Sequence, residues 1–160
     1  MKDLWEDLNG RIPEYFKSII TKYSLKVIKI SRLETALVSD SYVLIIEIDR
    51  FNADIAYITR DERNKLVKYN CNNFFAEKYD EDDRHHLLNG DTANERISND
   101  LIIISHGLES KWSNVLSGDK DWIRVFEKSQ WFGISRLKSD ELLFEELLVK
   151  NEKKSKGLER

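Results

Sequence analysis

The 160-residue chain has the length of a single domain and a net charge of −3, although 34% of its residues are charged. This balance argues against a general nucleic-acid-binding protein, which is expected to be strongly basic. The single cysteine, Cys71, excludes an internal disulfide, and the longest uncharged apolar stretches, 42–46 and 101–104, are far too short to span a bilayer.

The N-terminal third of the chain predicts a helix followed by a sheet. Apolar residues recur at three- and four-residue spacing between Leu4 and Tyr23, and Pro13 suits the first turn of a helix. We therefore expect a short opening turn and then a helix over 13–23. From residue 25 the apolar period changes to two, which predicts strands near 25–28, 36–38, 42–49 and 55–59. Close strands joined by short polar turns indicate an antiparallel meander of three to four strands.

The middle of the chain contains the strongest helical signal. A short helix is expected over 72–79, and an acidic loop over 80–91. The longest helix follows, because apolar side chains between 93 and 115 repeat on one helical face. Asp91 or Thr92 can cap its N-terminus, since a short polar side chain can accept a hydrogen bond from the first turn.

The C-terminal part predicts two more helices, one beginning after Asp119 and one capped by Ser139. The order of elements predicts an α+β fold with an N-terminal helix, an antiparallel sheet of three to four strands, and a C-terminal helical half packed on the sheet. Residues 1–149 are expected to form one domain, and residues 150–160 a charged, flexible tail.

Motifs of the common enzyme classes are absent from the sequence. It contains no glycine-rich phosphate loop, no GxSxG, no HExxH and no paired CxxC, so we expect neither a conventional enzyme nor a cofactor. Asp82, Asp83, His85 and His86 form the one constellation that could hold a divalent metal or act as acid and base. Adjacent histidines point apart in helix and strand, so a solvated acidic loop is preferred, and a small metal-dependent enzyme is kept as an alternative.

Single residues add a second alternative. His106 lies inside the longest predicted helix, where a structural hydrogen bond is the expected role, and Cys71 is expected to be an inert thiol. Among the four tryptophans, Trp131 is the candidate for exposure, next to Phe132. An exposed aromatic pair would suit a regulatory or structural subunit of mobile-element origin that associates with itself. The sequence leaves the oligomeric state open.

Acidic residues are concentrated in one part of the chain. Between Glu77 and Asp100 there are eight acidic and three basic residues. The composition, with 16 Ile, 16 Lys and 11 Asn but five Ala and one Pro, is typical of an AT-rich bacterial gene. Acidic residues at Asp3, Glu6 and Asp7 fall where a signal peptide would have its apolar run, which predicts a cytoplasmic protein.

A small acidic domain of this composition, with a helix leading into the strand 42–50 (YVLIIEIDR) and then a helical half, resembles the immunity proteins of bacterial contact-dependent inhibition and polymorphic toxin systems. The resemblance spans the whole chain and implies a protein that binds and blocks one cognate toxin, without contacting nucleic acid or membrane itself. Such toxins are often nucleases, whose basic clefts would attract an acidic inhibitor. The expected partner-binding residues are Asp80, Glu81, Asp82, Asp83, Asp91 and Glu95.

Overall fold

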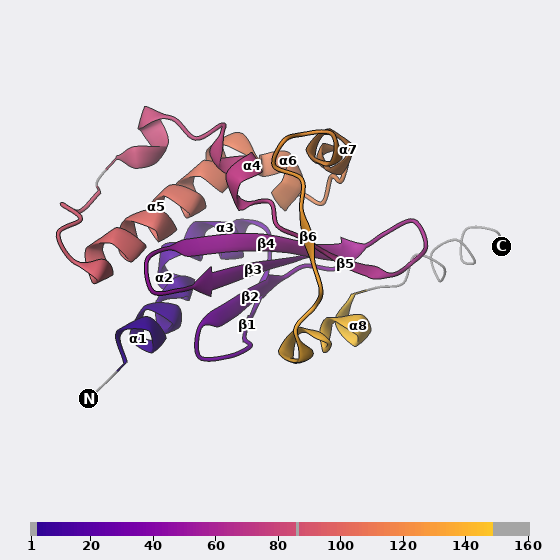
Figure 1. Ribbon diagram of the computed structural model, residues 1–160, viewed down its shortest axis with the longest axis horizontal. Helices are drawn as coiled ribbons and strands as arrows, with labels where there is room; N and C mark the ends of the chain where they lie inside the picture. Colours follow the sequence, from indigo (N-terminus) through magenta and orange to yellow (C-terminus); the bar gives the residue numbers. More distant parts are fainter. Residues whose placement is uncertain (1–2, 86, 149–160) are drawn as a thin grey trace.

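The computed structural model describes residues 3–85 and 87–148 and has the predicted α+β class (Figure 1). Its centre is one six-stranded sheet in which the strands follow one another in chain order and every neighbouring pair is antiparallel. The strands are β1 (Lys26–Lys29), β2 (Glu34–Val38), β3 (Val43–Ile48), β4 (Ala53–Arg60), β5 (Leu66–Tyr69) and β6 (Ile134–Ser135).

The sheet has two strands more than the upper limit predicted. β1 to β4 lie where the period-two pattern placed them, whereas β5 and β6 were missed. β5 has four residues, one of them Lys68, and β6 has two exposed residues, so neither has a clear apolar alternation. Both are defined by pairing across the chain, with Lys68 opposite Ser135 and Tyr69 opposite Ile134.

Helices of very different length surround the sheet. The structure has α1 (Leu4–Gly10), α2 (Ile12–Tyr15), α3 (Lys17–Lys22), α4 (Asn72–Ala76), α5 (Ala93–Lys111), α6 (Ser113–Leu116), α7 (Trp122–Glu127) and α8 (Phe144–Leu147), and two 3₁₀ helices, η1 (Glu81–Arg84) and η2 (Ser139–Glu141). The helix expected over 13–23 is divided into α2 and α3 at Phe16 (φ −105°, ψ 16°).

The longest helix begins as predicted and ends earlier. Thr92 caps α5, and its hydroxyl accepts a hydrogen bond from the Glu95 amide at 3.1 Å. α5 ends at Lys111, because the next residue, Trp112, has a non-helical φ of −129°, and Val115 therefore belongs to α6. The predicted cap at Ser139 is wrong. Ser139 lies inside η2, and there the Glu141 carboxylate accepts a hydrogen bond from the Lys138 amide at 2.7 Å.

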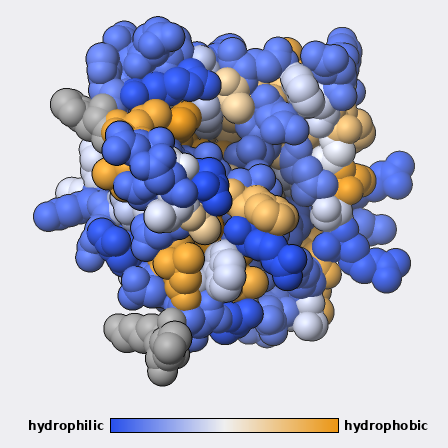
Figure 2. Space-filling model, turned by 60° about the vertical axis from the view of Figure 1, so that its left-hand side comes forward, coloured by the Kyte–Doolittle hydropathy of each residue, from blue (hydrophilic) through white to orange (hydrophobic). Residues whose placement is uncertain are grey.

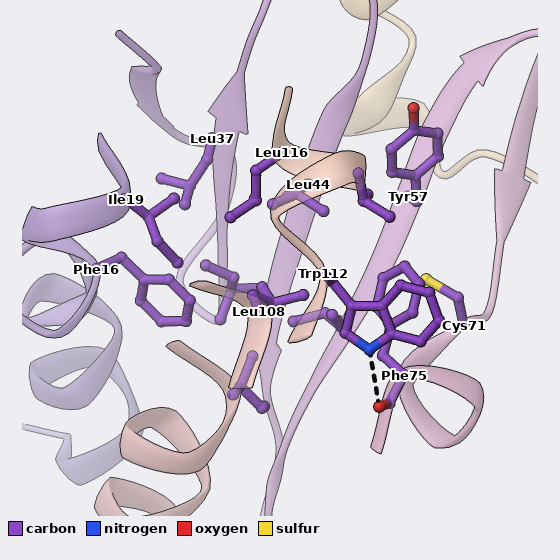
Figure 3. Packing of buried hydrophobic residues seen from close by; sticks show 14 of the residues in the cluster. Phe16, Ile19, Leu37, Leu44, Tyr57, Cys71, Phe75, Leu108, Trp112 and Leu116 are labelled. Carbon is purple, nitrogen blue, oxygen red and sulfur yellow. Dashed lines mark hydrogen bonds between the residues drawn. The ribbon is translucent and has the colours of Figure 1, made fainter. Parts of the chain in front are cut away.

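The main hydrophobic core lies between one face of the sheet and the helices α1 to α7. Leu37 lies beside Ile19 and Leu44 beside Leu116, and all four side chains are buried (Figure 3). Tyr57, which is also buried, stacks on Tyr42 with 5.3 Å between ring centres. The indole of Trp112 donates a hydrogen bond to the Phe75 carbonyl at 3.0 Å, which fixes α4 against the end of α5 (Figure 3). Cys71 lies in this core, where burial raises the pKa of its thiol, as expected for an unreactive cysteine.

The second face of the sheet is covered by the C-terminal segment, residues 136–148. This segment leaves β6 and crosses the sheet to α8, on the side opposite α4 to α7 (Figure 1). Phe144 and Leu148 are buried there against Val43, Ile45 and Ile58. The C-terminal helices therefore pack on both faces and not on one. Among the described residues, no helix is long and apolar enough to cross a membrane.

Candidate functional site

The structure separates the predicted partner-binding residues into exposed and buried positions. Asp80, Glu81 and Asp82 are exposed at η1, and Asp91 is exposed just before α5. Glu95 is half-buried in the first turn of α5, where its carboxylate accepts a hydrogen bond from the Asp91 amide at 3.0 Å. These residues are placed so that a protein partner could reach their carboxylates.

Asp83 is the exception, because its side chain is completely buried. Its two carboxylate oxygens lie 2.7 Å from His106 Nδ1 and 3.1 Å from Lys111 Nζ, and they accept hydrogen bonds from the Ser110 hydroxyl and the Asp80 amide. Burial alone would raise the pKa of Asp83, but the hydrogen bonds outweigh it and hold the pKa well below its usual range. Asp83 therefore attaches η1 to α5, and its expected role in partner binding is corrected.

The candidate metal constellation is divided in the same way. Asp82 Oδ1 lies 3.4 Å from His85 Nε2, whereas Asp83 faces His106 and α5. The residues described by the structure contain no group of three or more His, Cys, Asp or Glu placed to hold a metal ion. His86 lies outside the described residues. His106 makes the structural hydrogen bond expected of it.

A second group of carboxylates, which the sequence pattern did not indicate, lies at the β3–β4 hairpin. The Ala53 amide donates to Asp100 Oδ2 at 3.1 Å and so places the hairpin beside α5. Burial raises the pKa of Asp54, and the nearby Asp49 and Asp100 raise it further. Burial also raises the pKa of Asp100, with Asp49 contributing again. These three carboxylates repel one another in the native state.

We call Asp49, Asp54, Asp91, Glu95 and Asp100 the acidic end of the molecule. It lies at the left of Figure 1, where the β3–β4 hairpin meets α5, and hydrophilic residues cover most of the surface in Figure 2, which brings this side forward. Arg50, which follows Asp49 in the hairpin, is an exposed basic residue at this end, whereas two other nearby arginines donate hydrogen bonds to backbone carbonyls. The guanidinium of Arg84 donates to the Asp80 carbonyl and that of Arg96 to the Gly90 carbonyl, each at 3.2 Å.

Asp54→Asn is expected to raise the free energy of unfolding by about 0.5–2 kcal/mol at neutral pH, the range typical of relieved surface repulsion. Because the folded-state pKa of Asp54 is above the unfolded value of 3.8, protonation favours the native state. This contribution is present below the unfolded pKa and is lost as pH rises through the folded pKa, so the advantage of Asn should grow with pH. Urea unfolding at several pH values measures it, with the exposed Asp140→Asn as the matched control.

The aromatic pair predicted near the C-terminal helices is only partly exposed. Trp131 is half-buried and its indole donates a hydrogen bond to Glu77, while Phe132 is 44% exposed and packs against Phe126 with 5.4 Å between ring centres. Neither residue adjoins the acidic end in sequence.

No protein-family model, curated protein or solved structure matches this chain. The residues of the chain itself are therefore the basis for a proposed function.

Proposed function

We propose that this chain is a stoichiometric inhibitor that neutralises a cognate bacterial toxin by binding it through the acidic end. The observation that carries the proposal is the placement of Asp49 and Asp54, from the β3–β4 hairpin, beside Asp100 of α5, where the Ala53 amide donates to Asp100. A positively charged partner would be attracted by all three carboxylates, although Asp49 and Asp100 also accept backbone hydrogen bonds within the protein.

A toxin that cleaves nucleic acid has the complementary surface. Its substrate cleft is basic because it binds phosphates, and carboxylates on an inhibitor can occupy the same positions. Asp91 and Glu95 add negative charge along the first turns of α5, and Asp80 to Asp82 add more at η1. An extended acidic surface of this kind accelerates association with a basic cleft by electrostatic steering.

The proposal is tested by co-expression with the protein encoded directly upstream of this gene. That protein should arrest growth when expressed alone, this chain should restore growth, and the two should co-purify in equal amounts. A harmless upstream product, or a complex weaker than micromolar, would contradict the proposed function.

The binding surface is tested with the same partner and two sets of neutral substitutions. Asp49→Asn, Asp91→Asn and Asp100→Asn together should lower the association rate by about tenfold or more and weaken its dependence on salt. The control combines Asp40→Asn, Glu62→Gln and Asp119→Asn, three exposed acidic residues in turns elsewhere on the molecule. Equal association rates for the two triple variants would exclude the acidic end as the interface.

A further inference from the structure

A polar pocket of about 470 Å³ lies on the second face of the sheet, beside the C-terminal segment. Ile45 and Ala56 line it from the sheet, and Asp54 lies at the start of β4. The chain from Ser135 to Lys138 forms another part of its lining as it leaves β6. The volume falls within the range of about 300–1,000 Å³ that is usual for small-molecule sites.

Most charged groups of this pocket are neutralised within the protein. Lys68 Nζ contacts Glu141 Oε2 at 2.8 Å, and Lys138 Nζ forms ion pairs with Glu47 and, at 3.5 Å, with Glu34. Burial and the neighbouring Glu141 raise the pKa of Glu34, while Lys138 lowers it. These ion pairs connect the C-terminal segment to the sheet and leave little charge for a ligand.

Two charged side chains of opposite sign line the same pocket without a partner. Within the part of the chain that the structure describes, neither the Asp54 carboxylate nor the Arg136 guanidinium forms a hydrogen bond or an ion pair. Asp54 is half-buried and Arg136 is exposed. Of the carboxylates near Asp54, Glu47 is already paired with Lys138, which leaves those of Asp49 and Asp100. A cationic group placed at Asp54 would also be attracted by the carboxylates of Asp49 and Asp100.

We propose that this pocket binds a small zwitterion, with its cationic nitrogen at Asp54 and its carboxylate at Arg136. A ligand with both charges satisfies both side chains at once, whereas an ion of one sign leaves the other side chain without a partner. Hydrogen bonds between ionised groups are the stronger kind, and a guanidinium can bind a carboxylate through two of them. The amide of Asn73 lines the same pocket and can add a neutral hydrogen bond.

The experiment is a titration of the ¹⁵N-labelled protein with zwitterions of increasing charge separation: glycine, 4-aminobutanoate, 6-aminohexanoate and lysine. At least one of them should shift the backbone amide signals of Asp54, Asn73 and Ser135 and saturate at millimolar concentration. Butylamine and butanoate carry one charge each and should bind at least about tenfold more weakly, because each can satisfy only one of the two side chains. No saturable shift with any zwitterion, or equal shifts with the single-charge compounds, would overturn the proposal.

Asp54→Asn and Arg136→Gln should each weaken zwitterion binding by about tenfold, the loss expected for one charge-assisted contact. Asp140→Asn and Arg63→Gln, exposed residues outside the pocket, are the matched controls and should leave binding unchanged. The changes in the free energy of unfolding caused by the two single substitutions should also add up to the change in the double variant. A strong coupling between them would mean that Asp54 and Arg136 pair with each other and would contradict a site open to ligand. Because the titration needs no toxin, the pocket and the proposed function can fail separately.

Discussion

Lys68→Met is expected to lower the free energy of unfolding by about 3–5 kcal/mol, the range typical of breaking a buried ion pair by removing one partner. Lys68 is 7% exposed and Glu141 is completely buried, and their charged groups lie 2.8 Å apart. Without the ammonium group, the Glu141 carboxylate would remain buried without its main counter-charge. Unfolding in urea measures the loss, and Lys65→Met, an exposed lysine just before the same strand, should change stability far less.

A second substitution shows whether the loss comes from the unpaired carboxylate of Glu141 or from altered packing at Lys68. In the native protein the Glu141 carboxylate accepts a hydrogen bond from the backbone amide of Lys138 at 2.7 Å. Glu141→Gln removes the negative charge, but the oxygen of the glutamine side chain can still accept this hydrogen bond. Lys68→Met with Glu141→Gln should therefore recover most of the stability that Lys68→Met loses. If the double variant is as unstable as the single one, the loss does not come from the unpaired carboxylate.

Asp83→Ala is expected to cost about 2–4 kcal/mol, because it removes a buried carboxylate that accepts several charge-assisted hydrogen bonds. The loss should be concentrated at η1, where hydrogen exchange of the Asp80 amide should become much faster, since that amide donates to Asp83. Asp82→Ala is the matched control within the same 3₁₀ helix. The Asp82 side chain is 80% exposed, so its removal should change stability by about 0.5 kcal/mol or less.

The contribution of Asp83 should also depend on pH in a defined direction. Its folded-state pKa is lowered from the unfolded value of 3.8, so the native state is stabilised by the ionised carboxylate. This stability is present above the unfolded pKa and is lost as pH falls toward the folded one. Wild type and Asp83→Ala should therefore differ most near neutral pH and approach each other in acid. A difference that stays constant down to about pH 2 would show that ionisation of Asp83 is not the cause.

The sequence predicted the elements whose signal is local. The apolar stripe of α5 and its Thr92 cap follow from residues three and four positions apart, and the alternation in β3 and β4 follows from neighbouring residues. β5 and β6 could not be predicted this way, because Lys68 is buried only where Glu141, 73 residues later, supplies the opposite charge. A buried lysine has the same appearance in a sequence as an exposed one.

The candidate site was likewise predicted only in part from the sequence. By itself the sequence determined the α+β class, the excess of acidic residues between 77 and 100, and the absence of common catalytic motifs. Only the tertiary structure decided which of those residues face solvent, because burial of Asp83 depends on Ser110 and Lys111 one helix away. It likewise brought Asp49 and Asp54 beside Asp100, about 50 residues further along the chain, since hairpin and helix meet only when the core between them is packed.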